Sequence, residues 1–322
     1  MGPSTTKQML IDRVDADKDQ LITFLRGFLR AKSPNPPGDT REATSYITDY
    51  LDGKGVEYQV VGPDPEKPNI VSTFQSPVEG KKLILNGHID VFPVGSGEGW
   101  SQEAWGGELV DGKIYGRGAC DMKAGTTASI YTYLVLHELR EQLKGSVTLT
   151  AVSDEETGGR LGAGWLIENV PETLGDCCIN GEPSSPYTIR FGEKGILWLK
   201  MRVKSKGGHG AYPHLSVNPI KIASKIITEL ESLNEIPVPY PENLRKAIDE
   251  GHDAAEKALG EGGAEIMSRL SVNIGTIEGG LKVNVIPRAC SFEVDLRLPP
   301  GLSKDDVLPK VEEIVSKYEG AS

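Results

Sequence analysis

Three apolar, strand-like segments of this chain run directly into side chains that can bind metal ions. The segments are 82–86, 146–152 and 176–180, and the imidazole and carboxylate groups that follow them are His88, Asp90, Glu155, Glu156 and Glu182. Helical periodicity separates the segments, and this strand–helix alternation is typical of an α/β sheet with parallel strands. The carboxyl ends of parallel strands share one edge of a sheet, so we expect these side chains to meet there.

A further carboxylate, Asp121, stands at the start of a helix predicted for residues 123–143. Without cations, so many carboxylates would repel one another and raise their own pKa values. Imidazole and carboxylate groups are suitable ligands for zinc or a similar ion. Asp90 is placed to accept the other ring N–H of His88 and so fix its tautomer. Of two adjacent glutamates, one can bind metal while the other acts as a general base on water.

The pattern changes near residue 190. Three strands and two helices are predicted there, in the order 196–203, 217–234, 268–277, 285–298 and 303–318. This β-α-β-β-α order indicates a small sheet with two helices on one face. We therefore expect an α/β protein with a mainly parallel, doubly wound catalytic domain over residues 1–190. A smaller α/β lid domain is expected over residues 191–322. Further single helices are predicted at 12–30 and 241–260.

The composition limits the partners and the location. With 46 acidic and 35 basic residues the formal net charge is −11, which argues against nucleic acid and anionic membranes as partners. No run of 18 apolar residues predicts a membrane span, and no secretory signal is recognised. The four cysteines form no CxxC pair, and Cys177 and Cys178 lie in an apolar run, which predicts buried free thiols. A cytoplasmic location is predicted.

Five short motifs resemble those of the M20 metallopeptidase family. They are NGHIDV at 86–91, YGRGACDMK at 115–123, SDEETG at 153–158, KGGHGAYPH at 206–214 and NVIP at 284–287. The motif at 206–214 is similar to the lid signature of the desuccinylase and deacetylase branch. The resemblance extends from about residue 20 to the end of the sequence and implies a catalytic domain with an inserted lid.

The resemblance also implies a dinuclear centre, with two Zn²⁺ ions per subunit and Co²⁺ or Mn²⁺ as alternatives. His88 would bind one ion, Asp121 would bridge both, and Glu156 and Glu182 would bind one each. Glu155 would be the general base that takes a proton from the attacking water. The peptide bond that follows Asp121 would be cis. Asp90 would support the imidazole of His88.

For the lid, the resemblance implies that the protein is a homodimer. His209 would stabilise the oxyanion, reaching in from the partner subunit. Tyr212, Asn284 and Arg297 would contact the substrate carboxylate, Arg297 because a guanidinium fork matches a carboxylate. The implied activity is hydrolysis of the amide bond in a small N-acyl amino acid or dipeptide. The identity of the acyl group and of the amino acid is not predicted.

Members of the family have a further metal-binding histidine after the lid. The five histidines here stand at 88, 137, 209, 214 and 252, and none takes that place. One metal site is therefore expected to lack a ligand. The alternative function is that of a truncated, catalytically impaired relative acting as a dimerising or regulatory module. A nucleotide-binding loop at 95–99 is excluded, because no helix is predicted after its glycines.

Overall fold

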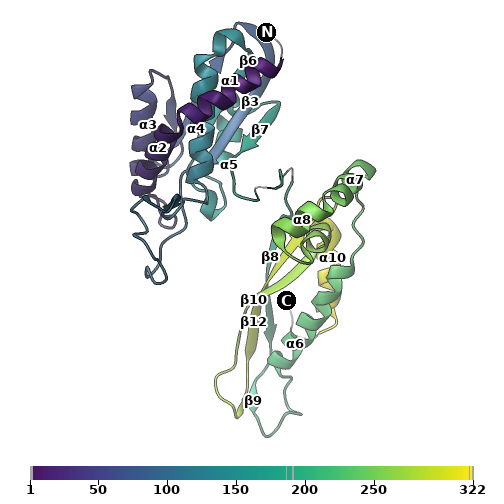
Figure 1. Cartoon of the computed structure of the whole chain (residues 1–322). Coiled ribbons are helices and arrows are strands. Elements are labelled where there is room, and N and C mark those ends of the chain that lie inside the picture. Colours follow the sequence, from purple (N-terminus) through teal and green to yellow (C-terminus); the bar gives the residue numbers. More distant parts are fainter. Residues whose placement is uncertain (1–2, 186, 191, 319, 321–322) are drawn as a thin grey trace. The chain divides into compact units, whose positions relative to one another are not determined.

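A computed structural model describes residues 3–185, 187–190, 192–318 and 320 of the chain (Figure 1). The chain divides into two compact units, Met1–Pro183 and Ser184–Ser322. Each unit has its own sheet and its own hydrophobic core. Within the described residues, no helix has both the length and the apolar character needed to cross a membrane.

The first unit contains a five-stranded sheet in the order β1-β2-β6-β3-β7. Its strands are β1 (Gln59–Val61), β2 (Asn69–Gln75), β3 (Val78–His88), β6 (Lys144–Val152) and β7 (Cys177–Asn180). β6, β3 and β7 run parallel, whereas β2 and β1 add antiparallel strands at one edge. β6 is buried along almost its whole length, as is typical of a central strand in a sheet covered on both faces.

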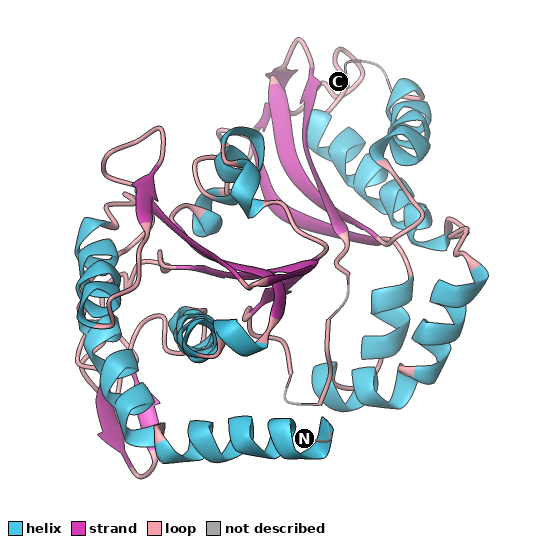
Figure 2. Ribbon diagram, turned by 90° about the horizontal axis from the view of Figure 1, so that it is seen from above, coloured by secondary structure: helices cyan, strands magenta, loops and turns pink. Residues whose placement is uncertain are grey.

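Helices cover both faces of this sheet (Figure 2). The helices are α1 (Pro3–Ala16), α2 (Lys18–Arg30), α3 (Arg41–Gly53), α4 (Lys123–Glu138) and α5 (Ala163–Asn169). Alternate residues of β2 and β6 enter two different cores. Ile70 and Leu149 pack with α2, α3 and α4, and Val71 and Val152 pack with α5 on the opposite face. The fold is thus a doubly wound α/β sheet.

The second unit is a three-stranded antiparallel sheet, in the order β10-β12-β8, with helices on one face. Its main elements are β8 (Gly195–Lys204), α6 (Pro219–Leu230), β10 (Ser271–Gly279), β12 (Ala289–Leu298) and α10 (Lys304–Ser316). α6 and α10 pack against Phe292 and its neighbours. On the other face Trp198 is 72% exposed. This is the split β-α-β arrangement that the sequence predicts.

Shorter elements complete both units. They are the hairpin β4 (Glu108–Val110) and β5 (Lys113–Tyr115), the helices α7 (Glu242–Glu250), α8 (His252–Leu259) and α9 (Gly263–Ser268), and the paired strands β9 (Gly208–His209) and β11 (Val285–Ile286). The element after the glycines at 95–99 is β4 and not a helix. This agrees with the exclusion of a nucleotide-binding loop.

The structure corrects three sequence predictions. The helix expected at 12–30 is two helices that meet at Asp17, and the helix expected at 241–260 divides at Gly251. Cys177 and Cys178 are exposed, so the prediction of buried thiols is wrong for both. The reason is that β7 lies at the edge of the sheet, where all four of its residues are exposed.

Candidate metal centre

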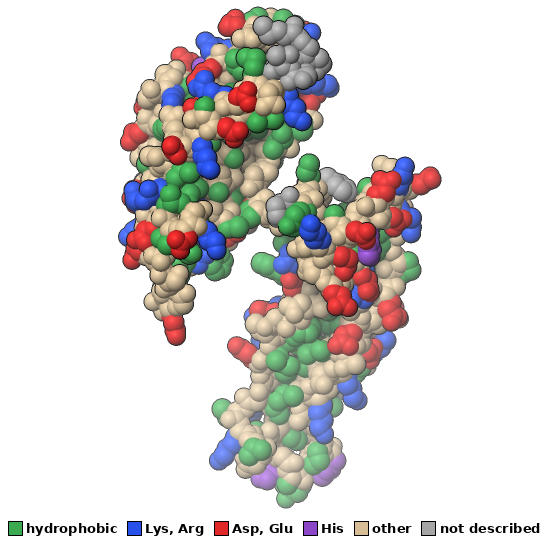
Figure 3. Space-filling model, in the orientation of Figure 1, with side chains coloured by type: hydrophobic (Ala, Val, Ile, Leu, Met, Phe, Trp, Pro, Cys, Tyr) green, Lys and Arg blue, Asp and Glu red, His purple; other side chains and the backbone are tan. Residues whose placement is uncertain are grey.

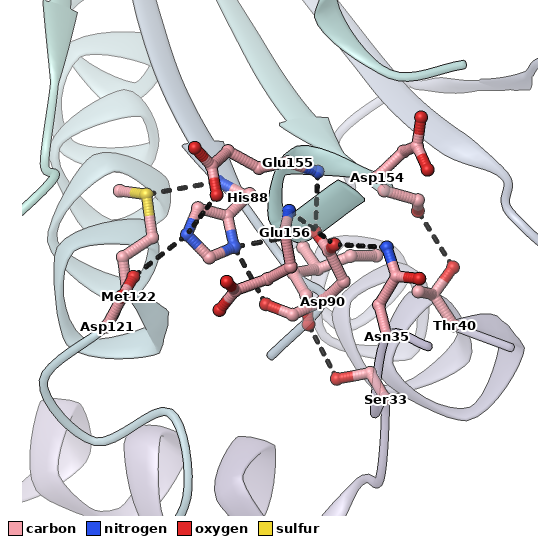
Figure 4. A network of polar contacts seen from close by, with 12 residues as sticks. Ser33, Asn35, Thr40, His88, Asp90, Asp121, Met122, Asp154, Glu155 and Glu156 are labelled. Carbon is pink, nitrogen blue, oxygen red and sulfur yellow. Dashed lines mark hydrogen bonds and ion pairs between the residues drawn. The ribbon is translucent and has the colours of Figure 1, made fainter. Parts of the chain in front are cut away.

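The six predicted site residues of the first unit lie together at one edge of its sheet, and Figure 4 labels all of them except Glu182. His88 ends β3, Glu155 and Glu156 begin a short 3₁₀ turn after β6, and Glu182 follows β7. Because β6, β3 and β7 are parallel, their carboxyl ends meet at this edge. Asp121 stands just before α4, which packs on β3 and β6. The topology therefore gathers ligands from four separate segments.

The imidazole of His88 is buried, and its Nδ1 atom is fixed against Asp90. Its Nδ1 atom lies 2.7 Å from the main-chain carbonyl oxygen of Asp90 and 3.4 Å from the Asp90 carboxylate. A carbonyl oxygen can only accept, so Nδ1 carries the proton. Nε2 then faces Asp121 at 3.1 Å, Glu182 at 3.5 Å and Glu155 at 3.8 Å, and a cation that displaces its proton would meet the Nε2 lone pair there. This is the orientation that a metal-binding imidazole requires.

The Asp90 carboxylate is fully buried and is surrounded by donors. Its two oxygens accept hydrogen bonds from the main-chain N–H groups of Glu155 at 3.2 Å and Glu156 at 3.1 Å. The side-chain amide of Asn35 donates to it at 2.8 Å. Burial alone would raise the pKa of Asp90, but the hydrogen bonds from His88 and Asn35 lower it to about 2. Asp90 therefore stays ionised and fixes the backbone of both glutamates.

The remaining carboxylates of the cluster repel one another and are harder to ionise. Burial, and then the charge of Asp121, raises the pKa of Glu156 to about 7. Burial is also the main cause that raises the pKa of Glu155 and of Asp121. For His88, burial alone would lower the pKa, but hydrogen bonds to the surrounding carboxylates, first that of Asp90, raise it to about 11. The cluster thus favours a positive charge at its centre, which a metal cation would supply.

Two groups of three ligand atoms lie close enough to hold a cation. One group is His88, Asp121 and Glu182, the other is His88, Glu155 and Glu156, and the atoms of each lie within 4.8 Å of one another. Two ligand atoms on a tetrahedral zinc ion, with bonds of about 2.1 Å, are separated by about 3.4 Å. The distances from Nε2 to Asp121 and Glu182, 3.1 and 3.5 Å, are close to that value. The donor set therefore fits a divalent cation.

Several residues that support this edge were not singled out in the sequence. The N–H of His88 donates to the Met122 sulfur at 3.2 Å, and the Asp121–Met122 peptide bond is cis, as the resemblance implied. Lys123 is buried and donates to two carbonyl oxygens at the end of α2. Asp154 holds the turn of the two glutamates, and Asn35 lies behind Asp90. The polar partners of Lys123 and Asn35 are distant in sequence, whereas Asp154 bonds to Thr157 and Leu161 within its own segment.

The predicted residues of the second unit fall into two places. His209, Tyr212 and Asn284 gather where β9 and β11 pair, with the rings of His209 and Tyr212 5.7 Å apart. The N–H of Gly210 donates to the main-chain oxygen of Asn284 at 2.8 Å. His209 is exposed, and Figure 3 shows histidine side chains at the surface of this end of the unit.

Arg297 lies in β12, at the end of the three-stranded sheet that is remote from the β9–β11 pair. It pairs with Ile196, the second residue of β8, and with Ser271, the first residue of β10. β8 rises about 3.3 Å per residue, so its two ends are roughly 30 Å apart. The Arg297 guanidinium contacts Asp295 at 2.9 Å. The structure therefore separates Arg297 from the loop that carries His209.

Known proteins resemble the chain in sequence and in fold. Residues 191–321 match the M20 peptidase dimerisation domain. A succinyl-diaminopimelate desuccinylase from Gluconacetobacter diazotrophicus is 29% identical over 286 residues, which cover 86% of this chain and 66% of that protein. The chain spans 59 to 74% of the length of the curated desuccinylases it matches.

Two solved structures share the fold. An M20 family metallo-carboxypeptidase from Sulfolobus solfataricus aligns with a TM-score of 0.74 at 21% identity, covering 92% of this chain and 75% of that one. A dinuclear metal-binding peptidase of the M20 family from Bacillus subtilis aligns with a TM-score of 0.60 at 18% identity, covering 96% and 73%.

The fold and the site together define a two-unit α/β protein with a His/Asp/Glu cluster suited to divalent cations. The chain is similar to M20 metallopeptidases: residues 191–321 match the dimerisation domain of that family, and curated desuccinylases and M20 structures resemble the rest.

Proposed function

We propose that this protein is a metal-dependent amidohydrolase that cleaves the amide bond of a small N-acyl amino acid or dipeptide. The observation that carries the proposal is the imidazole of His88. Its Nδ1–H is fixed on a carbonyl oxygen, and its Nε2 faces the carboxylates of Asp121, Glu155 and Glu182 at 3.1 to 3.8 Å. The matched relatives, named as a desuccinylase and a metallo-carboxypeptidase, support the reaction class.

Four side chains would hold the cations. His88, Asp121, Glu156 and Glu182 offer one nitrogen and three carboxylate groups, which suit Zn²⁺, with Co²⁺ or Mn²⁺ as alternatives. A pair of such cations supplies Lewis acidity for the scissile carbonyl and lowers the pKa of water. Asp121 belongs to the first ligand group and also raises the pKa of Glu156 through its charge, which favours it as the bridge between two ions.

Glu155 is proposed as the general base. Its main-chain N–H is held by the buried Asp90, while its side chain is 54% exposed and lies 3.8 Å from Nε2 of His88. The backbone is thus fixed and the carboxylate can reach a water molecule. A carboxylate in this place takes a proton from the attacking water and returns it to the leaving amine.

We place His209 in the site of a partner subunit, where it would stabilise the oxyanion. Arg297 pairs near the start of β8 and His209 follows the end of β8, in β9, and that distance exceeds the length of a small N-acyl amino acid. One lid therefore cannot place both residues against one substrate. β8 and β10 are both edge strands, and pairing one of them with its copy in a second chain would satisfy its free backbone groups. The strand next to the 204–214 loop is β8. The match to a dimerisation domain supports this assembly.

The surroundings of Arg297 favour a substrate that carries a carboxylate. Burial, and then the charges of Arg269 and Arg297, lower the pKa of Lys194 to about 8. Both arginines also pair with carboxylates, Arg269 with Glu265 and Arg297 with Asp295, so a substrate carboxylate would share or replace these partners. Lys194 donates to Ser271, which pairs directly with Arg297. A guanidinium fork binds a carboxylate through two parallel hydrogen bonds. Tyr212 and Asn284 are proposed as further contacts, made together with His209.

A substrate panel tests the proposal. N-acetyl amino acids, N-succinyl amino acids and dipeptides are incubated with the protein and Zn²⁺ or Co²⁺, and released amine is measured. We expect hydrolysis that a chelator abolishes and added metal restores. If a metal-loaded dimer hydrolyses none of the three classes, the alternative role as a dimerising or regulatory module replaces the enzymatic one.

A further inference from the structure

Asn35 lies in the loop between α2 and α3 and has a buried side chain, 1% exposed. Its amide nitrogen donates two hydrogen bonds. One goes to the carboxylate of Asp90 at 2.8 Å (Figure 4), and the other to the hydroxyl oxygen of Thr157 at 3.0 Å. A single amide therefore connects the segment after β3 with the turn after β6.

Both segments carry proposed metal ligands. Asp90 accepts the ring N–H of His88 on its carbonyl oxygen and the two glutamate N–H groups on its carboxylate. Thr157 is the last residue of the turn that begins with Glu155. Among the described residues, the second ligand group consists of His88 with Glu155 and Glu156. Asn35 thus connects the two segments that supply this group.

The hydrogen bonds run in one consistent direction. The Thr157 hydroxyl donates to Asp154 at 2.6 Å, so its oxygen is free to accept from Asn35. Asp154 also accepts from Lys67 at 3.3 Å and from the N–H of Leu161 at 2.9 Å. Only a side-chain amide places two N–H donors on one atom at the end of so short a side chain. An aspartate of the same size would offer acceptors alone.

We propose that Asn35 is a positioning residue that sets the spacing between His88 and the Glu155–Glu156 turn, and thereby the affinity of the cluster for a divalent cation. The inference rests on the proposed function, which requires a cation at this cluster. Without the amide, the buried Asp90 carboxylate and the Thr157 hydroxyl oxygen each lose a donor. The ligands on the two segments are then free to move apart.

The loop itself does not depend on this amide. The main-chain N–H of Asn35 donates to the carbonyl oxygen of Val91 at 2.9 Å. The N–H of Val91 in turn donates to the carbonyl oxygen of Ser33 at 3.0 Å. Variants at Asn35 are therefore expected to fold. Ser33 provides a matched control, because its buried hydroxyl donates to the carbonyl oxygen of Ile89 at 2.6 Å without touching Asp90 or Thr157.

The experiment compares the whole wild-type chain with Asn35→Leu, Asn35→Asp and Ser33→Ala. Zn²⁺ affinity is measured by competition with a chromophoric chelator, the visible spectrum of bound Co²⁺ reports ligand geometry, and urea unfolding of the metal-free proteins reports stability. Removing a group that supports metal ligands typically costs about 10–100-fold in affinity. We expect that loss and an altered Co²⁺ spectrum in both Asn35 variants. Ser33→Ala is expected to lose stability while keeping the wild-type affinity and spectrum.

Wild-type affinity in either folded Asn35 variant would overturn the inference, and Asn35→Asp, which keeps the size of the side chain, serves if Asn35→Leu does not fold. An equal loss of affinity in Ser33→Ala would also overturn it, because the loop would then act through stability alone. If the wild-type chain binds no metal, the proposed function itself fails. If the wild type does bind metal, but no more tightly than the Asn35 variants, only the inference about Asn35 fails.

Discussion

Arg297 and His209 lie at opposite ends of β8, since Arg297 pairs with its second residue and His209 stands in β9, five residues after its last. A side chain fixed at each end of a rigid sheet can serve two different sites. If Arg297 holds the substrate of its own subunit, His209 is available to the site of another. The proposed dimer therefore follows from the length of the sheet and from the size of the substrate.

Complementation between inactive chains tests this arrangement. Glu155→Gln and His209→Ala are each expected to give a nearly inactive homodimer. In a mixed dimer, the chain that keeps Glu155 receives His209 from its partner, so one of the two sites works. Random exchange of subunits should restore about a quarter of the wild-type activity.

The control is a mixture prepared without subunit exchange, which should stay inactive. Exchange is verified by two affinity tags carried on different chains. A mixture that stays inactive after proven exchange would show that His209 does not act across the dimer.

Glu155→Gln alone separates catalysis from metal binding. The amide cannot take a proton from water, so turnover should fall at least about 100-fold, the usual scale of general-base catalysis. Bound metal should remain nearly unchanged, because His88, Asp121 and Glu182 are untouched. Turnover and metal content are measured on the same preparation, with the exposed Glu141→Gln as the control. A tenth of the wild-type turnover in the variant would assign Glu155 another role.

The metal-free protein should lose stability as the pH rises through the range in which Glu156 ionises. Burial, and then the charge of Asp121, raises the pKa of Glu156 from its ordinary 4.5 to about 7 in the folded state. The folded state therefore binds more protons than the unfolded state between these values. The stabilising contribution is complete below pH 4.5 and is lost as the pH rises through 7.

The measurement is urea unfolding of chelator-treated wild type and Glu156→Gln at pH 4.5 and pH 7.5. Relative to Glu156→Gln, the free energy of unfolding of the wild type should be lower at pH 7.5 than at pH 4.5. Glu141→Gln, on the exposed surface, should show no such change. If this relative stability of the wild type stays constant with pH, or increases at pH 7.5, the pKa of Glu156 is not raised in the folded state.

Lys123→Met tests the support of the segment that carries Asp121. The buried Nζ of Lys123 donates to the carbonyl oxygens of Phe28 at 2.9 Å and Ala31 at 2.7 Å. Methionine fills similar volume and leaves both oxygens unpaired, which should cost about 2–4 kcal/mol of unfolding free energy. Chemical denaturation measures the loss, with the exposed Lys113→Met as control. Wild-type stability in Lys123→Met would show that the buried ammonium group contributes little.

The sequence predicted the parts of this site that follow from local residue patterns and from the parallel order of the strands. His88, Glu155 and Glu182 could be placed at one edge because each follows an apolar strand of a parallel sheet. The cis bond after Asp121 came from the family resemblance and is present. These features depend on residue type and strand order alone.

The remaining features depend on contacts between distant segments. Asn35 stands in a proline-rich stretch that indicates only the end of a helix, and its partners Asp90 and Thr157 lie 55 and 122 residues away. The burial of Cys177 was predicted wrongly because an apolar run does not show that its strand lies at an edge. The sequence could indicate Arg297 as a ligand for a carboxylate. It could not give the distance between Arg297 and His209, because that distance depends on how β12 pairs with β8.

Metal binding by the wild-type chain tests the central claim most directly. Isothermal titration of the metal-free protein with Zn²⁺, checked by elemental analysis after desalting, should show at least one tightly bound ion per chain. His88→Ala should abolish that binding, because it removes the only nitrogen from both ligand groups of the described chain. A wild-type protein that retains no zinc, or a His88→Ala variant that binds as tightly as the wild type, would contradict the account.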